Sequence, residues 1–74
     1  MIFILVKFEI YHDGAYWCAR SIGGDADIFT QGPTMDDLMT NIREAVELQF
    51  EDVLRTGTPI QVLTFSEIEV PPLA

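Results

Sequence analysis

Hydrophobic residues follow two different periods along this chain. Residues 2–11 are mostly β-branched or aromatic and contain almost no turn formers, which predicts a strand. Asp13-Gly14 predicts a tight turn after it, because glycine tolerates a positive φ. Residues 15–21 then predict a second strand, and residues 27–31 predict a short third strand beyond the turn at Gly23-Gly24. These three strands are expected to pair as an antiparallel meander.

A helical period replaces the strand pattern after Gly32-Pro33, with Thr34 as the expected N-cap. One apolar arc of this helix holds Met35, Leu38, Met39, Ile42, Ala45, Val46, Phe50 and Val53. Gln49 falls in the same arc, and we expect it to be a buried amide. The helix is expected to end near residues 54–56, because Gly57 is a good C-cap and Pro59 prevents continuation.

Residues 60–70 predict a last strand, which Pro71-Pro72 ends. The element order is therefore β-β-β-α-β. A right-handed crossover from the third strand would place the last strand parallel to the first, on its free edge. The sequence thus predicts an α+β fold with a four-stranded mixed sheet in the order 3-2-1-4 and one helix on one face. We expect a single domain over residues 1–74, with a short tail from Pro71 to Ala74.

One helix covers only one face of such a sheet. The first and last strands are apolar on both sides, as is typical of sheets buried on both faces. We therefore expect a homodimer or a higher symmetric homo-oligomer, formed through the second face or through an exposed strand edge. The residues expected at a face-to-face interface are Phe3, Leu5, Leu63 and Phe65. The alternative is that loops cover this face, although the loops are short.

Composition narrows the class of partner. Hydrophobic residues make up 49% of the chain and charged residues 22%, which excludes an intrinsically disordered protein. Four basic residues against twelve acidic ones give a net charge of -8. Such a chain repels phosphate backbones, so we expect no direct nucleic-acid binding and favour a basic protein as partner. The apolar N-terminal run is too short and wrongly flanked for a membrane span or a signal peptide.

Candidate catalytic residues are few. The single histidine, His12, lies at a predicted hairpin tip, where a solvated turn residue is the better interpretation. The single cysteine, Cys18, excludes an internal disulfide, indicates a reducing, cytoplasmic setting and is interpreted as a packing residue. Asp13, Asp25 and Asp27 match no calcium-loop spacing, so no metal site and no cofactor are expected.

The helix face opposite its apolar arc is acidic, and this indicates a protein-binding surface rather than an active site. A basic partner would be steered by such charges, although they also suit an ordinary solvated helix face. Leu48 lies among the acids and outside the apolar arc. The residues expected to bind a partner are Asp36, Glu44, Glu47, Leu48 and Glu51.

Three segments together resemble the HicB-like family, the antitoxin side of the HicA–HicB toxin–antitoxin systems. Residues 13–17 (DGAYW) are similar to a DGGYWA-like hairpin, and residues 29–34 (FTQGPT) to an FTQGDT-like helix entry. Residues 35–48 (MDDLMTNIREAVEL) are similar to the helix LEEALENIKEAIEL. The resemblance spans about residues 2–54, in the family's order and spacing.

The resemblance implies a degraded RNase H-like domain without catalytic activity. It also implies an antitoxin that neutralises a small basic HicA-type mRNA ribonuclease by protein–protein binding. The family usually has a Pro-Gly loop before the third strand, where this chain has residues 22–27, and usually continues into a DNA-binding domain, so we expect no operator binding. One alternative is a stand-alone homo-oligomeric regulatory or scaffolding module. Another is a residual RNase H-like enzyme, for which Glu9 and Asp27 are the only strand-region candidates.

Overall fold

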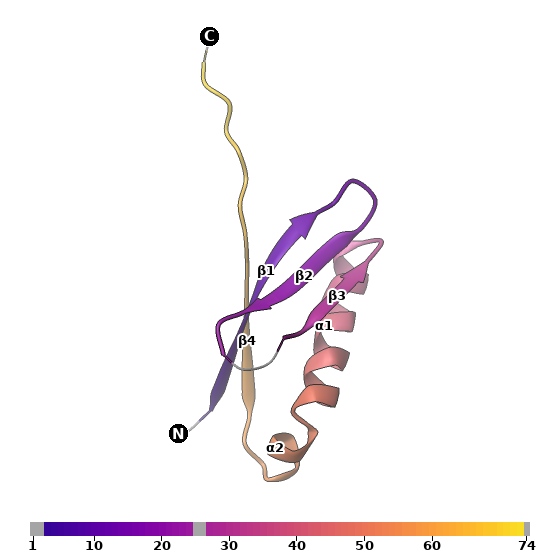
Figure 1. The fold of residues 1–74 in the computed structure, drawn as a ribbon, viewed down its shortest axis with the longest axis vertical. Coiled ribbons are helices and arrows are strands. Elements are labelled where there is room, and N and C mark those ends of the chain that lie inside the picture. Colours follow the sequence, from indigo (N-terminus) through magenta and orange to yellow (C-terminus); the bar gives the residue numbers. More distant parts are fainter. Residues whose placement is uncertain (1–2, 25–26, 74) are drawn as a thin grey trace.

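The computed structural model describes residues 3–24 and 27–73 of the chain. The strands and helices follow the predicted order, and Figure 1 shows their arrangement. They are β1 (Ile4–His12), β2 (Trp17–Ile22), β3 (Phe29–Gly32), α1 (Met35–Gln49), α2 (Glu51–Arg55) and β4 (Ile60–Ser66). The predicted start of the first strand at Ile2, the predicted turn residue Asp25 and the end of the tail at Ala74 lie outside the described residues.

The four strands form one mixed sheet in the order β3-β2-β1-β4, which confirms the predicted α+β topology. β1 pairs antiparallel with β2 and parallel with β4, while β2 pairs antiparallel with β3. The chain therefore crosses from one edge of the sheet to the other through α1 and α2. Both helices lie on the same side of the sheet, with α1 beside β3 and β2 (Figure 1).

The core lies between β1 and α1 and follows from their two periods. Alternate β1 residues point toward the helix, and Val6, Phe8 and Ile10 are buried there. The facing residues of α1 are spaced at three or four positions, and those that are buried are Leu38, Ile42 and Val46. Ala19 and Ile28 complete the same cluster. The apolar arc predicted for the helix is thus buried along its centre, while its flanks remain partly exposed.

The start of α1 is fixed by two local contacts. The Thr34 hydroxyl oxygen accepts a hydrogen bond from the Asp37 backbone N–H at 3.1 Å, which confirms the predicted N-cap. Gly32, at the end of β3, lies so close to this turn that a Cβ there would approach the Leu38 backbone nitrogen to 2.7 Å. Only glycine allows β3 and the first turn of α1 to pack at this distance.

The helix is not continuous as the sequence predicts. Phe50 leaves helical geometry with φ −115° and ψ 30°, so that a five-residue helix, α2, follows α1. Phe50 is half-buried and packs against the core, and this tertiary contact overrides the helical period at the break. Gln49 is exposed rather than buried, so the expectation of a buried amide is wrong. Each helix in residues 3–24 and 27–73 is too short or too polar to cross a membrane.

The last strand is shorter than the sequence predicts. Pairing between β1 and β4 ends at Ile10 and Ser66, two residues before β1 itself ends at His12. Residues 67–73 continue as an extended segment, called here the C-terminal arm, which projects beyond the rest of the molecule in line with β4 (Figure 1). Ile68, Val70 and Leu73 on this arm are almost fully exposed.

Two leucines of α1 give a matched test of this core. Leu38 is completely buried, whereas Leu48 is 78% exposed on the same helix. Leu38→Ala is expected to lower the free energy of unfolding by about 2–5 kcal/mol, because it removes apolar contacts and leaves a cavity. Leu48→Ala should change it by less than about 0.5 kcal/mol. Urea unfolding followed by circular dichroism measures both, and equal losses would contradict the described packing.

Candidate functional site

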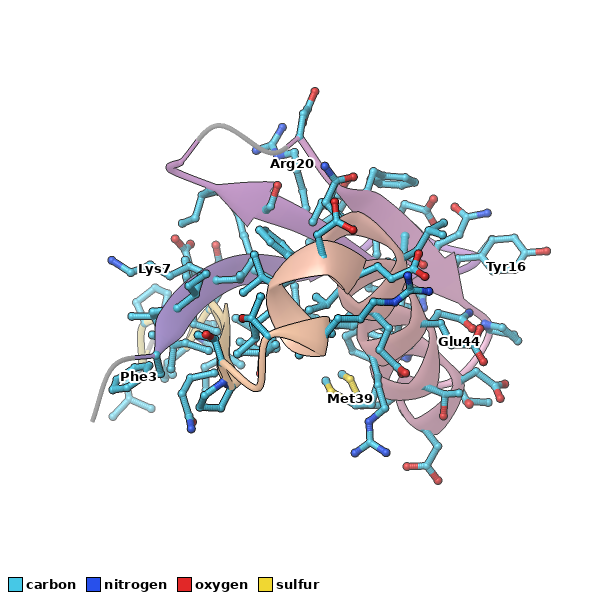
Figure 2. The ribbon with its side chains drawn as sticks, turned by 90° about the horizontal axis from the view of Figure 1, so that it is seen from below. Phe3, Lys7, Tyr16, Arg20, Met39 and Glu44 are labelled. Atoms are coloured by element: carbon cyan, nitrogen blue, oxygen red, sulfur yellow. The ribbon has the colours of Figure 1, made fainter. Side chains whose placement is uncertain are left out.

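The predicted partner-binding residues form an exposed surface on α1, called here the acidic surface. Asp36, Glu44, Glu47 and Leu48 are all exposed, and Leu48 is 78% exposed. Figure 2 shows Glu44 beside the coils of α1. Glu51 lies beyond the break at Phe50, on α2, so it is offset from the other four.

Charges on the two helices are unevenly balanced. Residues 35–55 hold six acidic side chains and only Arg43 and Arg55 as basic ones. Arg55 is bound by Glu51 one turn earlier in α2, so part of the local positive charge is already neutralised. The Asp37 carboxylate accepts a hydrogen bond from the Thr34 hydroxyl at 3.0 Å and belongs to the helix cap. Asp36, Glu44, Glu47 and Asp52 remain as exposed carboxylates that a basic partner could reach.

The second candidate surface is the face of the sheet that the helices leave open, called here the uncovered face. Phe3, Leu5, Leu63 and Phe65 all lie on it, and each is 40–49% exposed. The structure therefore brings together the four residues predicted for a homo-oligomer interface, and no loop in the described ranges buries them. Figure 2 shows Phe3 projecting from the sheet away from the helices.

This face is less uniformly apolar than the sequence pattern suggests. Lys7, Glu9 and Arg20 also project from it, and Arg20 pairs with Glu9 across β1 and β2 at 3.6 Å. Lys7 and Arg20 are labelled in Figure 2 on the side opposite α1. These charges lie between the apolar residues of β4 and Phe29 of β3, so the apolar area is concentrated toward β1 and β4.

A groove between the helices and β4 was not foreseen from the sequence. It has a volume of about 410 Å³, and its apolar lining is Met39, Ile42, Val46, Leu54, Ile60 and Val62. It exists because α1 packs over β3 and β2 and leaves the helix side of β4 open. One residue in the sequence could have indicated the groove. Leu54 is apolar but lies outside the apolar arc of the helix, and in the structure it lines the groove beside Ile60 and Val62 of β4.

The hairpin between β1 and β2 is held by Asp13, not by a catalytic cluster. One carboxylate oxygen of Asp13 accepts hydrogen bonds from the backbone N–H groups of Ala15 at 3.0 Å and Tyr16 at 2.8 Å. These bonds favour the charged form and hold the pKa of Asp13 below its ordinary value, the Tyr16 bond contributing most. Asp13 is therefore committed to closing the turn.

His12 and Cys18 are also occupied by local structure. The His12 Nδ1 accepts a hydrogen bond from the Gly14 N–H at 3.1 Å, and the His12 ring meets Trp17 edge-on at 4.7 Å between centroids. Cys18 is only 1% exposed. Burial, together with the nearby charge of Asp13, raises the pKa of the Cys18 thiol, which keeps it protonated and unreactive.

The Gly23-Gly24 turn lines a second, open hollow of about 580 Å³. The helix end at this hollow is the C-terminal one, because Gln49 and Phe50 contribute to its lining. A helix C-terminus carries partial negative charge, whereas phosphate loops place the ligand at a helix N-terminus. The turn therefore lacks the surroundings of a phosphate-binding loop.

Metal-ligating residues are scattered within the described ranges. No three His, Cys, Asp or Glu side chains in residues 3–24 and 27–73 are grouped so that they could hold a metal ion. Glu9, one of the two RNase H-like candidates, is paired with Arg20, and Asp27 precedes β3 outside the sheet. Asp25 lies outside the described residues.

Comparison of the chain with protein-family models, curated proteins and solved structures finds no match. The functional argument therefore depends on the acidic surface, the uncovered face and the groove themselves.

The role of Asp13 predicts a pH-dependent stability difference. Asp13→Ala should lower Tm at pH 7, because the Ala15 and Tyr16 N–H groups lose their charged acceptor. The lowered pKa of Asp13 means that its stabilisation is complete above the ordinary carboxyl pKa of about 3.9. It is lost as the pH falls through the lowered value. Thermal unfolding from pH 7 to pH 2 should show the two proteins converging.

The control for this experiment is Glu69→Ala, which removes an exposed carboxylate from the C-terminal arm. Its Tm should follow that of the parent protein at every pH. A Tm deficit of Asp13→Ala that stayed constant down to pH 2 would contradict the role given to the Asp13 charge.

Proposed function

We propose that this protein is a non-catalytic protein-binding module, a HicB-like antitoxin that neutralises a small basic HicA-type mRNA ribonuclease. The observation that carries the proposal is the acidic surface, in which exposed carboxylates surround the exposed apolar side chain of Leu48. A ribonuclease needs a basic surface to hold the RNA backbone. An acidic partner placed on that surface would compete directly with RNA.

Charge complementarity supports this mode of binding. The protein has a net charge of -8, and six of its acidic residues lie on or beside α1 and α2. A field of one sign accelerates encounter with an oppositely charged protein and discriminates against nucleic acid. The acids at the rim would act mainly on the association rate, because they stay solvated in the complex.

Leu48 gives the acidic surface an apolar anchor. Leu48 is 78% exposed in the single chain. A partner that removed this side chain from water would gain binding free energy from its burial. Interfaces combine a desolvated apolar centre with a polar rim. In the proposed complex Leu48 would occupy the centre, with Glu44 and Glu47 beside it.

The module is proposed to be non-catalytic because its reactive groups serve local structure. Asp13 closes a turn, His12 packs on Trp17, and Cys18 is buried with its thiol protonated. The proposed setting is the cytoplasm, where the mRNA substrate of such a ribonuclease is found.

Charge reversal tests the acidic surface. The triple variant Asp36→Lys, Glu44→Lys and Glu47→Lys should lower the association rate constant with a purified HicA-type ribonuclease by about tenfold at low salt. The difference should shrink at high salt, where the charges are screened. Surface plasmon resonance measures the rates, and a ribonuclease assay measures the loss of inhibition.

The matched control reverses the same number of charges elsewhere, at Asp27, Glu67 and Glu69, which are exposed and lie outside α1 and α2. Binding that fell equally in both triple variants would reflect net charge alone and would contradict a specific role for the acidic surface. Circular dichroism verifies that both variants remain folded.

The uncovered face favours a second candidate function, a stand-alone homo-oligomeric module with a regulatory or scaffolding role. Soluble monomers rarely leave a contiguous apolar area in water. Two uncovered faces packed together would bury Phe3, Leu5, Leu63 and Phe65. Such stacking is compatible with the acidic surface remaining free, because α1 lies on the opposite side of the sheet.

Leu5→Glu tests stacking of the uncovered faces. Leu5 lies on β1, one strand in from the free edge, and a carboxylate there would have to be desolvated in a stacked assembly. Multi-angle light scattering should show a smaller assembly than that of the parent protein. Asp52→Asn is the control, because it changes a charge on α2, on the opposite side of the sheet from the uncovered face. An assembly of unchanged mass would contradict stacking.

A further inference from the structure

The free edge of β4 and the C-terminal arm form one continuous extended segment. β4 is an edge strand of the sheet, and the arm prolongs it without a partner strand in the described structure. Residues 60–70 contain neither proline nor glycine and are bounded by Pro59 and Pro71. Long exposed edges of this kind pair readily with another strand, and natural proteins usually protect them. Here the two prolines bound the segment, and Glu67 and Glu69 are its only charged residues.

Hydrogen bonding fixes which backbone groups face the free edge. The Ile4 N–H donates to the Pro59 carbonyl oxygen at 3.2 Å, and Ile4 lies in register with Ile60. The N–H and C=O of one strand residue point to the same side, and the side alternates along the strand. Residues 61, 63 and 65 therefore direct these groups toward β1. The residues that direct them to the free edge are Ile60, Val62, Thr64 and Ser66.

The side chains of this segment are arranged almost symmetrically about Phe65. Phe65 lies six residues from Pro59 and six from Pro71. In an antiparallel pair of two identical segments centred on Phe65, each residue on the helix side meets one of similar character in the second copy, whereas on the other side Leu63 meets Glu67 and Gln61 meets Glu69. The facing pairs on the helix side would be Ile60 with Val70, Val62 with Ile68, and Thr64 with Ser66.

We propose that two copies of this chain associate edge to edge, with β4 and the C-terminal arm of each pairing antiparallel to the same segment of the other about a two-fold axis at Phe65. The two sheets then join into one. The even-numbered residues, whose backbone groups face the free edge, form the hydrogen-bonded pairs. The two Phe65 residues form a non-hydrogen-bonded pair, the type in which facing Cα atoms are about 4.5 Å apart. The interface is isologous, as a two-fold axis requires.

This arrangement covers the apolar side chains that the single chain leaves exposed. Ile68 and Val70 are 86% and 78% exposed, and they would pack beside Val62 and Ile60 of the second copy. Val62 and Ile60 line the groove under Met39 and Leu54, so each arm would close the open side of the other copy's groove. The exposed arm of one copy and the open groove of the other would therefore bury each other's apolar side chains.

Charge on the uncovered face is also complementary in this register. Lys7 lies beside Leu63 in the β1–β4 pairing, and Leu63 would face Glu67 of the second copy. With strands about 4.8 Å apart, Lys7 and that Glu67 lie roughly 10 Å apart at Cα, within reach of the two long side chains. Within residues 3–24 and 27–73 the ion pairs use Arg20 and Arg55, so Lys7 has no acidic partner there. Glu67 of the second copy would be an acidic partner for Lys7, and this charge pairing favours a second copy of this chain at the edge.

Substitutions on the arm test the association. The double variant Ile68→Asp and Val70→Asp places two carboxylates against the second copy, and it should weaken the dimer by about 100-fold or more. Leu73→Asp is the matched control, because Leu73 is 98% exposed but lies beyond Pro71, outside the pairing. Analytical ultracentrifugation over a range of concentrations should show a dimer for the parent chain and for Leu73→Asp, and a monomer for the double variant.

The arm residues belong to no core cluster, so circular dichroism should show the double variant folded. A parent chain that is monomeric at every concentration would overturn the proposal. A double variant that dimerises as tightly as the parent would overturn it too, because its dimer must then use another surface, such as the uncovered face.

Disulfide trapping tests the register. In a Cys18→Ala background, Phe65→Cys should form a covalent dimer under mild oxidation, because facing residues of a non-hydrogen-bonded pair lie within disulfide range. Leu63→Cys alone should not cross-link, whereas a mixture of Leu63→Cys and Glu67→Cys chains should give a covalent heterodimer. Non-reducing electrophoresis distinguishes these products. Absence of the Phe65→Cys dimer, or equal cross-linking of Leu63→Cys alone, would overturn this register.

Discussion

The structure depends on β1, the longest strand, in which every residue from Ile4 to His12 pairs with β2, with β4 or with both. Its helix-side residues Val6, Phe8 and Ile10 are buried against α1, and the same strand aligns β2 and β4. A long strand that packs on one face and pairs on both edges links the hairpin, the helix and the last strand. Because chain-distant β4 joins at β1, the fold closes only when the crossover through α1 and α2 is complete.

That arrangement leaves three surfaces without a covering element: the groove, the uncovered face and the free edge of β4. One long helix is too narrow to cover four strands, so a groove opens over β4 and the second face of the sheet remains open. Gly32 holds α1 close to β3, and this tight contact shifts the helix away from β4. The same close approach that fixes the core therefore exposes the edge at the other side of the sheet. A small domain buries only a modest fraction of its surface, and association offers the remaining burial.

The topology followed from the sequence because its signals were local and agreed with one another. Asp13-Gly14, Thr34 and the 3.6-residue arc each define one turn, cap or helix, and the sheet order then follows from connection rules. The break at Phe50, the exposure of Gln49 and the end of β4 at Ser66 depend on tertiary contacts. The periodic pattern cannot show where pairing between β1 and β4 ends, or that a half-buried phenylalanine ends a helix. The residues predicted for each surface share one side of the structure, apart from Glu51, whereas the charged residues of the uncovered face and the groove were not predicted.

The separation of charge and apolar area decides how the proposed associations fit together. Two copies of a chain with a net charge of -8 repel each other, and repulsion is greatest where the carboxylates of α1 would meet. Pairing through β4 avoids that contact, because backbone hydrogen bonds and apolar side chains dominate there and Lys7 lies nearby. Asp36, Glu44 and Leu48 of the acidic surface lie outside the groove, whereas Glu47 also lines it. Self-association at the edge and binding of a basic partner on α1 therefore use largely different surfaces, which meet at Glu47.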